Sequence, residues 1–180
     1  MTALAHAALP TVRTMRWWPL AAVTVPVTGL VLLARSEGRP AEPVLLLAAA
    51  ALASLSVGAL RDDAATTLEA LPTSLARRRV LRLALVGAPV LLVWWSLVAL
   101  GDSTRPGVAA LLALTSSGVA VAVWAPARRS VRAGAAVPVL WFAADRLVTG
   151  WAGDLLAWWR TDPWPVLAVA LVAIVLGSRR

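Results

Sequence analysis

The sequence predicts an all-α fold of the membrane, a polytopic bundle of about six transmembrane helices in a single domain, residues 1–180. Hydrophobic residues make up 60% of the chain and charged residues 14%, whereas soluble domains carry about 25% charged residues. The apolar residues form long continuous runs, and the charged residues gather in short clusters between them. Lipid is the solvent that suits such runs, so each run is a candidate span.

Six apolar runs define the predicted spans. They cover residues 17–34, 43–60, 83–100, 106–125, 134 to about 149, and 164–178. A helix rises about 1.5 Å per residue and needs roughly 17 to 25 residues to cross the hydrocarbon. The first four runs satisfy this requirement. Asp145 and Arg146 interrupt the fifth run, and the last has only 15 residues, so the fifth and sixth spans are the short ones.

The distribution of arginine predicts the orientation. All 17 basic residues are arginine, and loops on the cytoplasmic side carry an excess of basic residues. With the N-terminus inside, the inner segments hold 12 arginines and the outer loops hold 5. The inner set is Arg13, Arg16, Arg61, Arg77, Arg78, Arg79, Arg82, Arg128, Arg129, Arg132, Arg179 and Arg180, and the outer set is Arg35, Arg39, Arg105, Arg146 and Arg160. Both termini are therefore expected in the cytoplasm.

Acidic residues and tryptophans agree with this orientation. Six of the nine acids fall in the predicted outer segments. Indoles favour the headgroup level of a bilayer. Trp17, Trp18 and Trp124 mark the inner level, Trp151, Trp158, Trp159 and Trp164 mark the outer level, and Trp94, Trp95 and Trp141 are expected to pack between helices. Abundant alanine and arginine without lysine is typical of a GC-rich bacterial genome, so the predicted location is the bacterial plasma membrane, with multiple passes.

Several function classes are excluded by what the chain lacks. There is no cysteine and one histidine, His6, so the sequence offers neither a metal site nor a histidine-based catalytic triad. No glycine-rich phosphate loop with lysine is present. The arginines lie at the ends of apolar runs and form no continuous basic face for nucleic acid. The sequence predicts no enzyme, no cofactor and no nucleic-acid partner.

The predicted inner loop, residues 61–82, is the longest polar stretch and the first candidate site. It places three acids before four arginines. Its first part is expected to form a short helix, with Asp62 or Asp63 near the N-terminus and Pro72 at the end. On physical grounds alone, the loop is equally well interpreted as a connector whose arginines bind anionic headgroups.

The same loop resembles a segment of the permease subunits of type-2 ATP-binding cassette exporters. These permeases carry an acidic stretch, then Thr-Leu-Glu, an apolar pair, a proline with a small polar residue, and basic residues that lead into the third helix. The matching residues are Asp62, Asp63, Thr67, Leu68, Glu69, Leu71, Pro72, Ser74, Arg77, Arg78 and Arg79. The resemblance implies a short cytoplasmic coupling-like helix between the second and third spans, where an ATP-binding cassette ATPase would dock.

This resemblance implies a permease-like subunit that couples a partner ATPase to export and pairs with itself or with another permease. Two alternatives stay open. One is a non-transporting membrane protein that uses the loop to hold a partner or lipids. The other is the substrate-capturing membrane component of a vitamin uptake transporter. Substrate identity cannot be read from the sequence, since lipid, drug and peptide exporters share these features.

Asp145 and Arg146 form the second candidate site. If the fifth helix starts near residue 134, Asp145 lies about 16 Å along it, near the middle of the bilayer, where charges are costly and often functional. Neighbours at i and i+1 do not face each other on a helix, so each needs a partner elsewhere or access to water. The favoured alternative ends the helix early and makes residues 145–162 an outer interfacial or re-entrant segment, with both charges screened by solvent. Leu155, Leu156, Trp158 and Trp159 would then rest in the outer interface.

Overall fold

The computed structural model describes residues 17–61, 75–103, 106–126 and 129–178, with residues 75–79 described by their backbone alone. Every regular element in these ranges is an α-helix, so the predicted all-α fold class is confirmed. The helices are α2 (Trp18–Ser36), α3 (Glu42–Gly58), α4 (Leu75–Gly101), α5 (Val108–Trp124), α6 (Ser130–Leu147), α7 (Trp151–Leu156), α8 (Trp158–Thr161) and α9 (Pro163–Gly177).

Each of the six predicted runs coincides with one long helix. Local sequence explains several of the boundaries. A proline lies in the first turn of α2, α3 and α9, where the missing N–H removes no helical hydrogen bond. Gly38 follows α2 with a φ of 65°, and the left-handed conformation that glycine accepts reverses the chain toward α3.

The third helix differs most from its predicted bounds. The sequence placed its start near residue 83, but α4 begins at Leu75. The last eight residues of the predicted inner loop, 75–82, are therefore helical, and the backbone of Arg77, Arg78 and Arg79 lies in the first two turns of α4. Arginine is a good helix former, so the helix continues after the apolar run has ended.

Two described helices are long and apolar enough to cross a membrane by length and composition, Trp18–Ser36 and Val80–Gly101. Three shorter apolar helices are α3 and α5, with 17 residues each, and α9, with 15. At about 1.5 Å per residue they cover roughly 22 to 26 Å, somewhat less than the roughly 30 Å hydrocarbon core. The helix α6 carries three charged residues, Arg132, Asp145 and Arg146.

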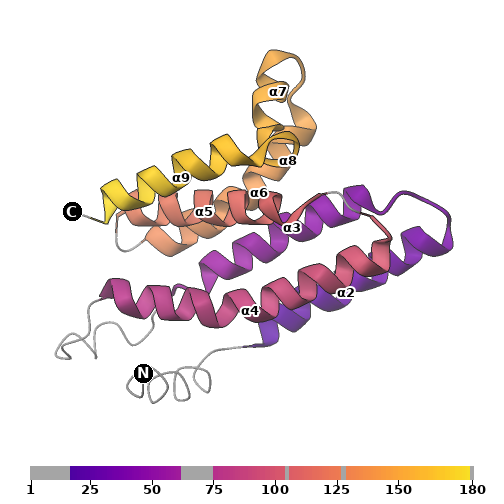
Figure 1. Ribbon diagram of the computed structural model, residues 1–180, viewed down its shortest axis with the longest axis horizontal. Coiled ribbons are helices and arrows are strands. Elements are labelled where there is room, and N and C mark those ends of the chain that lie inside the picture. The colour runs from indigo at the N-terminus through magenta and orange to yellow at the C-terminus, as the bar shows by residue number, and fades with distance from the viewer. Residues whose placement is uncertain (1–16, 62–74, 104–105, 127–128, 179–180) are drawn as a thin grey trace.

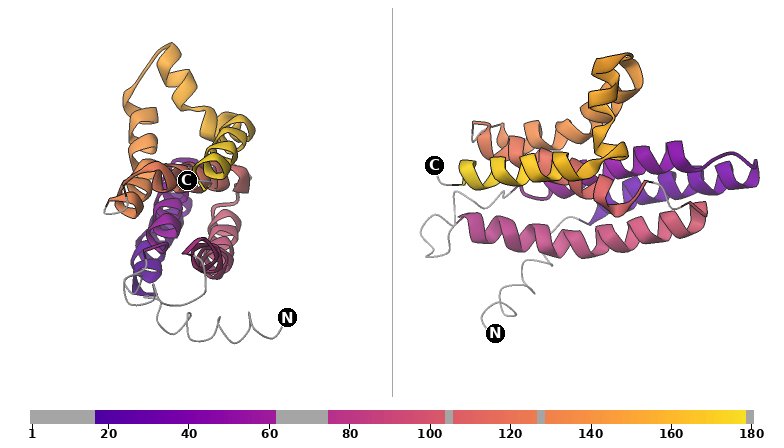
Figure 2. Two further views of the ribbon diagram at one scale, coloured as in Figure 1. Left: turned by 90° about the vertical axis from the view of Figure 1, so that its left-hand side faces the viewer. Right: turned by 45° about the horizontal axis from the view of Figure 1, so that its top comes forward.

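The long helices α2 to α6 run in alternating directions (Figure 1). The helices α2 and α4 lie on one side of α3, and α5, α6 and α9 lie on the other (Figures 1 and 2). The central α3 packs against α2, α4, α5 and α6, while α5 packs against α3, α6, α8 and α9. The short helix α7 projects away from the rest of the bundle, and α8 lies at its base against α5 and α9 (Figures 1 and 2).

Small side chains on α3 and α5 explain their central position. Nine of the 17 residues of α3 are buried, among them Ala48, Ala49 and Ala50, and nine of the 17 residues of α5 are buried as well. The peripheral α2 and α9 bury only two and one residues. Alanine-rich faces allow helices to approach closely, which substitutes for the missing hydrophobic effect when the surroundings are apolar.

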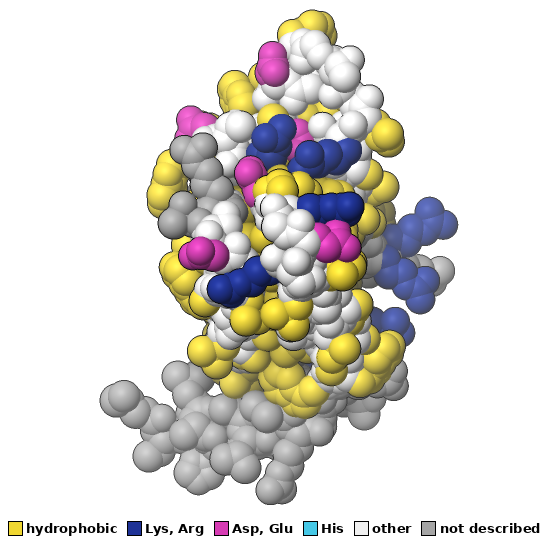
Figure 3. Space-filling view, turned by 90° about the vertical axis from the view of Figure 1, so that its right-hand side faces the viewer, with side chains coloured by type: hydrophobic (Ala, Val, Ile, Leu, Met, Phe, Trp, Pro, Cys, Tyr) yellow, Lys and Arg dark blue, Asp and Glu magenta, His cyan; other side chains and the backbone are white. Residues whose placement is uncertain are grey.

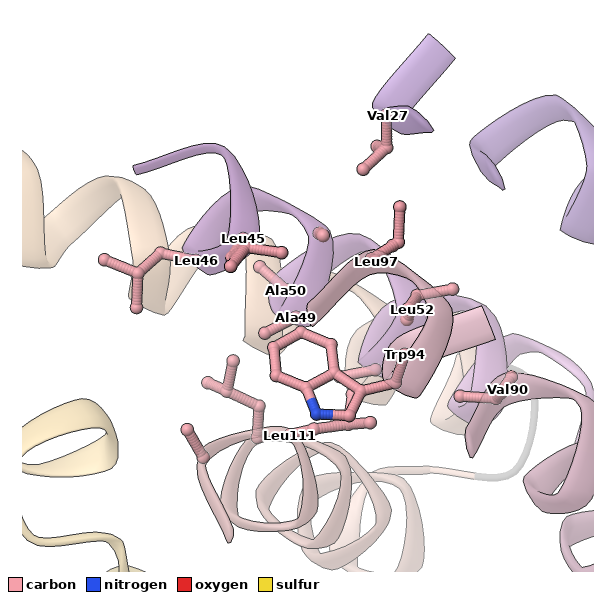
Figure 4. Close-up of a cluster of buried hydrophobic side chains, with 14 of the residues drawn as sticks. Val27, Leu45, Leu46, Ala49, Ala50, Leu52, Val90, Trp94, Leu97 and Leu111 are labelled. Atoms are coloured by element: carbon pink, nitrogen blue, oxygen red, sulfur yellow. The ribbon is translucent and has the colours of Figure 1, made fainter. Parts of the chain in front are cut away.

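Trp94 is the largest side chain of this interior and is fully buried. Its ring, from α4, lies between Ala49 and Ala50 of α3 and Leu111 of α5 (Figure 4). The neighbouring Trp95 is 58% exposed. The prediction that both rings pack between helices is therefore correct for Trp94 and wrong for Trp95, because successive residues differ by about 100° around a helix.

Glycines set the closest helix contact. A Cβ atom on Gly118 of α5 would lie 2.7 Å from the carbonyl oxygen of Gly134 of α6, and 2.8 Å from a side-chain carbon of Val57. A Cβ atom on Gly134 would meet the Gly118 carbonyl oxygen in turn. Only glycine fits at either position, so α5 and α6 cross with their backbones in contact.

The two neighbouring indoles offer a matched test of this interior. We expect Trp94→Ala to destabilise the fold by about 3 to 5 kcal/mol, because it leaves a cavity between α3, α4 and α5. Trp95→Ala, which removes the same side chain from an exposed position, should change stability by about 0.5 kcal/mol or less. Thermal unfolding of both variants in detergent micelles would measure the difference. Equal losses would contradict the buried position of Trp94.

Candidate functional site

Most of the first candidate site, the inner loop, lies outside the described residues. This holds for Asp62, Asp63, Thr67, Leu68, Glu69, Leu71, Pro72 and Ser74. The structure does describe the two flanks of the loop. An Nη atom of Arg82 donates a hydrogen bond to the backbone carbonyl of Arg61, which ties the start of α4 to the end of α3. The described residues that flank positions 62–74 therefore lie close together.

A second, smaller apolar cluster lies beneath these flanks. Val57, Leu60 and Ala122 are buried there, and Leu83 and Val131 pack against them. The cluster joins α3, α4, α5 and α6 at the end of the bundle where the inner loop starts. The cluster therefore connects four helices at this end of the bundle.

The second candidate site contains a buried ion pair. The Nε atom of Arg160 lies 2.9 Å from Oδ2 of Asp145, and Nη2 of Arg160 lies 3.3 Å from Oδ1. The Asp145 side chain is 1% exposed and that of Arg160 is 33% exposed. Two parallel N–H···O contacts between a guanidinium and a carboxylate fix both distance and orientation.

Sequence reasoning paired Asp145 with Arg146 as one site, and the structure separates them. Arg146 is exposed and lies over the ring of Phe142, with its Cζ atom 5.5 Å from the ring centroid, a cation–π contact. Asp145 points inward. The Asp145 side chain is buried within α6, so the expectation that solvent screens this charge is wrong, whereas Arg146 is exposed. The inference that each needs a partner elsewhere is confirmed for Asp145.

The partner, Arg160, was missed, although the sequence contains a signal for it. Between Arg146 and Arg179 the chain has one basic residue, Arg160. Arg160 is thus the next arginine along the chain after Arg146. The contact also requires the chain to reverse between α6 and α8, and the sequence left that reversal open.

Three local features produce this reversal. The helix α6 ends at Leu147, and Gly150 adopts a φ of 75°, which turns the chain back. A Cβ atom on Gly153 would lie 2.5 Å from the carbonyl oxygen of Val148, so α7 approaches the end of α6 too closely for any larger residue. We call the resulting unit, residues 141–161, the α6–α8 hairpin.

Further contacts hold the α6–α8 hairpin together and attach it to the bundle. Nε1 of Trp141 donates a hydrogen bond of 2.8 Å to the carbonyl oxygen of Leu156. The Trp159 ring is fully buried and belongs to the main apolar cluster, together with Trp94 and Leu111. Sequence reasoning had placed Trp159 in the outer interface, so the burial of this ring corrects that prediction. Its Nε1 atom finds no hydrogen-bond acceptor within the described part of the chain.

The chemistry available at this site is structural. Among the described residues no three acidic or histidine side chains come together to hold a metal ion. The carboxylate of Asp145 is engaged by Arg160. What the arrangement does is fix the α6–α8 hairpin at a defined place beside α5. Comparison with protein-family models, with curated proteins and with solved structures finds no match for this chain.

Because Asp145 is more deeply buried than Arg160, we expect that replacing each of them destabilises the fold by a different amount. Arg160→Met leaves the buried carboxylate of Asp145 unpaired and should cost about 3 kcal/mol. Asp145→Asn should cost less, roughly 1 to 2 kcal/mol, because the amide oxygen still accepts a hydrogen bond and the partly exposed Arg160 can reach water. Thermal unfolding in detergent would measure both.

Arg146→Gln is the matched control for these variants, since it removes an exposed arginine of the same helix without touching the pair. It should leave the unfolding temperature nearly unchanged. Losses of equal size for Arg146→Gln and Arg160→Met would show that the buried pair has no special role.

Proposed function

We propose that this chain is a six-span protein of the bacterial plasma membrane, with both termini in the cytoplasm, that acts as a permease-like subunit of an ATP-binding cassette exporter. The observation that carries the membrane assignment is the amount of apolar surface on the outside of the bundle. The coupling role rests on the resemblance of the inner loop. The two parts are argued separately below.

Large apolar side chains cover the outward faces of the peripheral helices. Across the described residues, 25 of them are exposed, including Val25 of α2, Leu92 of α4 and Val169 of α9, each at 70%. Moving such a side chain from water to lipid is favourable by on the order of 1 kcal/mol. Together these side chains favour lipid over water by tens of kcal/mol, so exposing this whole surface to water would be unfavourable.

Low burial distinguishes the two longest apolar helices from the core helices of soluble proteins. Within the apolar windows of α2 and α4, 17% and 22% of the residues are buried. A core helix of a soluble protein would be covered by its neighbours. These helices instead present most of their apolar residues outward, as spans in contact with lipid do.

The connections agree with the proposed sidedness. The helices α2 to α6 alternate in direction (Figure 1). The connections after α2, α4 and α6 therefore lie at one end of these helices, and the connections after α3 and α5 lie at the other end. Counted together with the helix ends that adjoin them, the first group holds six of the nine acids and five arginines, whereas the second group holds eight arginines. Acidic and basic side chains mix on the face that includes the α2–α3 turn (Figure 3).

The proposed coupling role follows from the inner loop and its attachment. An ATPase docked on Asp62 to Arg79 would move a loop whose flanks are tied by Arg82 and Arg61 and whose base rests on the cluster of Val57, Leu60 and Ala122. ATP-driven motion would pass through this cluster into four helices. In this proposal the chain contributes no catalytic residue of its own, and ATP hydrolysis belongs to the partner.

The close packing at the centre of the bundle limits where a substrate would pass. Fully buried side chains fill the space between α3 and α5, and the backbones of α5 and α6 touch at Gly118 and Gly134. A path between two copies, or between this chain and another permease, suits that packing better than a path through one copy. The same packing suits the second candidate, a non-transporting accessory protein. A rise in the ATPase activity of a co-purified partner on addition of this chain would favour the permease.

The topology can be tested at the C-terminus. A reporter that is active only outside the cytoplasm, fused after Arg180, should give no activity, because the arginine distribution places this end inside. The same reporter inserted after Asp102, in a predicted outer loop, should be active. Strong activity at Arg180 would mean that one of the short spans, α6 or α9, does not cross the membrane.

The partner contact can be tested at Glu69. We expect Glu69→Arg to release a co-purifying ATPase, because it reverses the charge of the acid in the Thr-Leu-Glu motif and leaves the apolar runs intact. Glu37→Arg makes the same change in the predicted outer α2–α3 turn and serves as the control. Membrane insertion should be normal in both. Unchanged co-purification of the ATPase with Glu69→Arg would remove Glu69 from the interface.

A further inference from the structure

The α6–α8 hairpin carries large apolar side chains that contact little of the described protein. Leu147 is 82% exposed, Trp151 is 78% exposed, and Leu155 and Trp158 are each 46% exposed. They lie on a unit that projects from the bundle (Figures 1 and 2). Two of the four are indoles, which favour the headgroup level of a bilayer.

These side chains cannot turn inward, because the inner side of the hairpin is already occupied. Arg160 engages Asp145, Nε1 of Trp141 bonds to Leu156, and Gly153 touches the backbone of Val148. Trp159 fills the position against the bundle. The hairpin is therefore a rigid unit that holds its exposed apolar side chains away from the core.

Charged residues alternate with the apolar ones on the hairpin, and this distinguishes it from a span. Arg146 and Asp154 are exposed within it. On α4, by contrast, the described exposed residues between Val80 and Ala99 are all uncharged. Acidic, basic and apolar side chains lie next to one another at the top of Figure 3, where the hairpin projects. Mixed indole and charged surfaces suit the headgroup layer, whereas uncharged apolar surfaces suit the hydrocarbon.

We propose that the α6–α8 hairpin is an interfacial anchor that lies in the headgroup layer of the outer leaflet and binds zwitterionic phospholipid. Trp151, Leu155 and Trp158 reach the boundary between headgroups and acyl chains. Arg146 faces lipid phosphate and Asp154 faces the ammonium group, which is why a headgroup with both charges fits. The buried pair of Asp145 and Arg160 keeps this surface at one depth. The inference rests on the proposed membrane function.

The chain offers a direct test, because it contains no cysteine and single cysteines can be labelled without background. We would place a spin label at Trp151→Cys, Leu155→Cys and, as the shallower position on the same helix at the level of the ammonium group, Asp154→Cys. Leu92→Cys on α4 serves as the deep position. Each protein would be reconstituted in phosphatidylcholine vesicles, and collisions of the label with dissolved oxygen and with a water-soluble nickel chelate would be measured.

We expect the labels at residues 151 and 155 to collide with the nickel chelate less often than the label at residue 154. Their ratio of oxygen to nickel collisions should lie between the ratio at residue 154 and the ratio at residue 92. Nickel collisions as frequent at residues 151 and 155 as at residue 154 would overturn the anchor. Labels at 151 and 155 that meet neither reagent would also overturn it, because protein, such as a second copy, would then cover the surface. Frequent nickel collisions at residue 92 would instead refute the proposed membrane function.

Discussion

The interior of this protein is too small to bury all of its apolar side chains, and the arrangement of the helices follows from that constraint. The helices α3 and α5 form the centre, and their buried residues are mostly alanine, leucine, serine and valine. The helices α2, α4 and α9 each bury one side against this centre and leave the rest of their leucine and valine outside. Every described regular element is an α-helix, in which backbone groups find their hydrogen-bond partners within the same segment.

The packing of the centre uses shape in place of hydrophobic contrast. When the surroundings are as apolar as the interior, leucine gains nothing by moving inward, and association depends on close contact. Gly118 and Gly134 allow α5 and α6 to touch, and Gly177 of α9 lies against Val123 and Trp124 of α5. There, Nε1 of Trp124 also donates a hydrogen bond of 2.8 Å to the carbonyl oxygen of Ala173. Small residues thus bring α6 and α9 to opposite sides of α5.

Sequence alone predicted the long helices within a few residues, apart from the start of α4, because apolar runs mark them directly. The start of α4 was misplaced because the prediction ended the helix with its apolar run, whereas arginine is a good helix former and the helix extends back to Leu75. The sequence did not show which of Trp94 and Trp95 is buried, because their burial depends on which side of α4 faces α3. The pairing of Asp145 with Arg160 depends on a chain reversal at Gly150, and hydrophobic periodicity does not predict such a reversal. The coupling-like loop remains a prediction from its residues.

Among the residues that the structure describes, Asp145 is the one buried charged residue, and the energetics of its pair with Arg160 indicate what the pair does. Burying an ion pair costs about as much in lost hydration as its attraction returns, so an apolar pair of the same volume would stabilise the fold as well. Apolar contacts, however, are not directional, so they alone would not fix the position of α8 against α6. A guanidinium that meets a carboxylate through two hydrogen bonds accepts one arrangement only. The pair therefore defines where Trp159 enters the bundle, and with it which indoles of the hairpin remain outside.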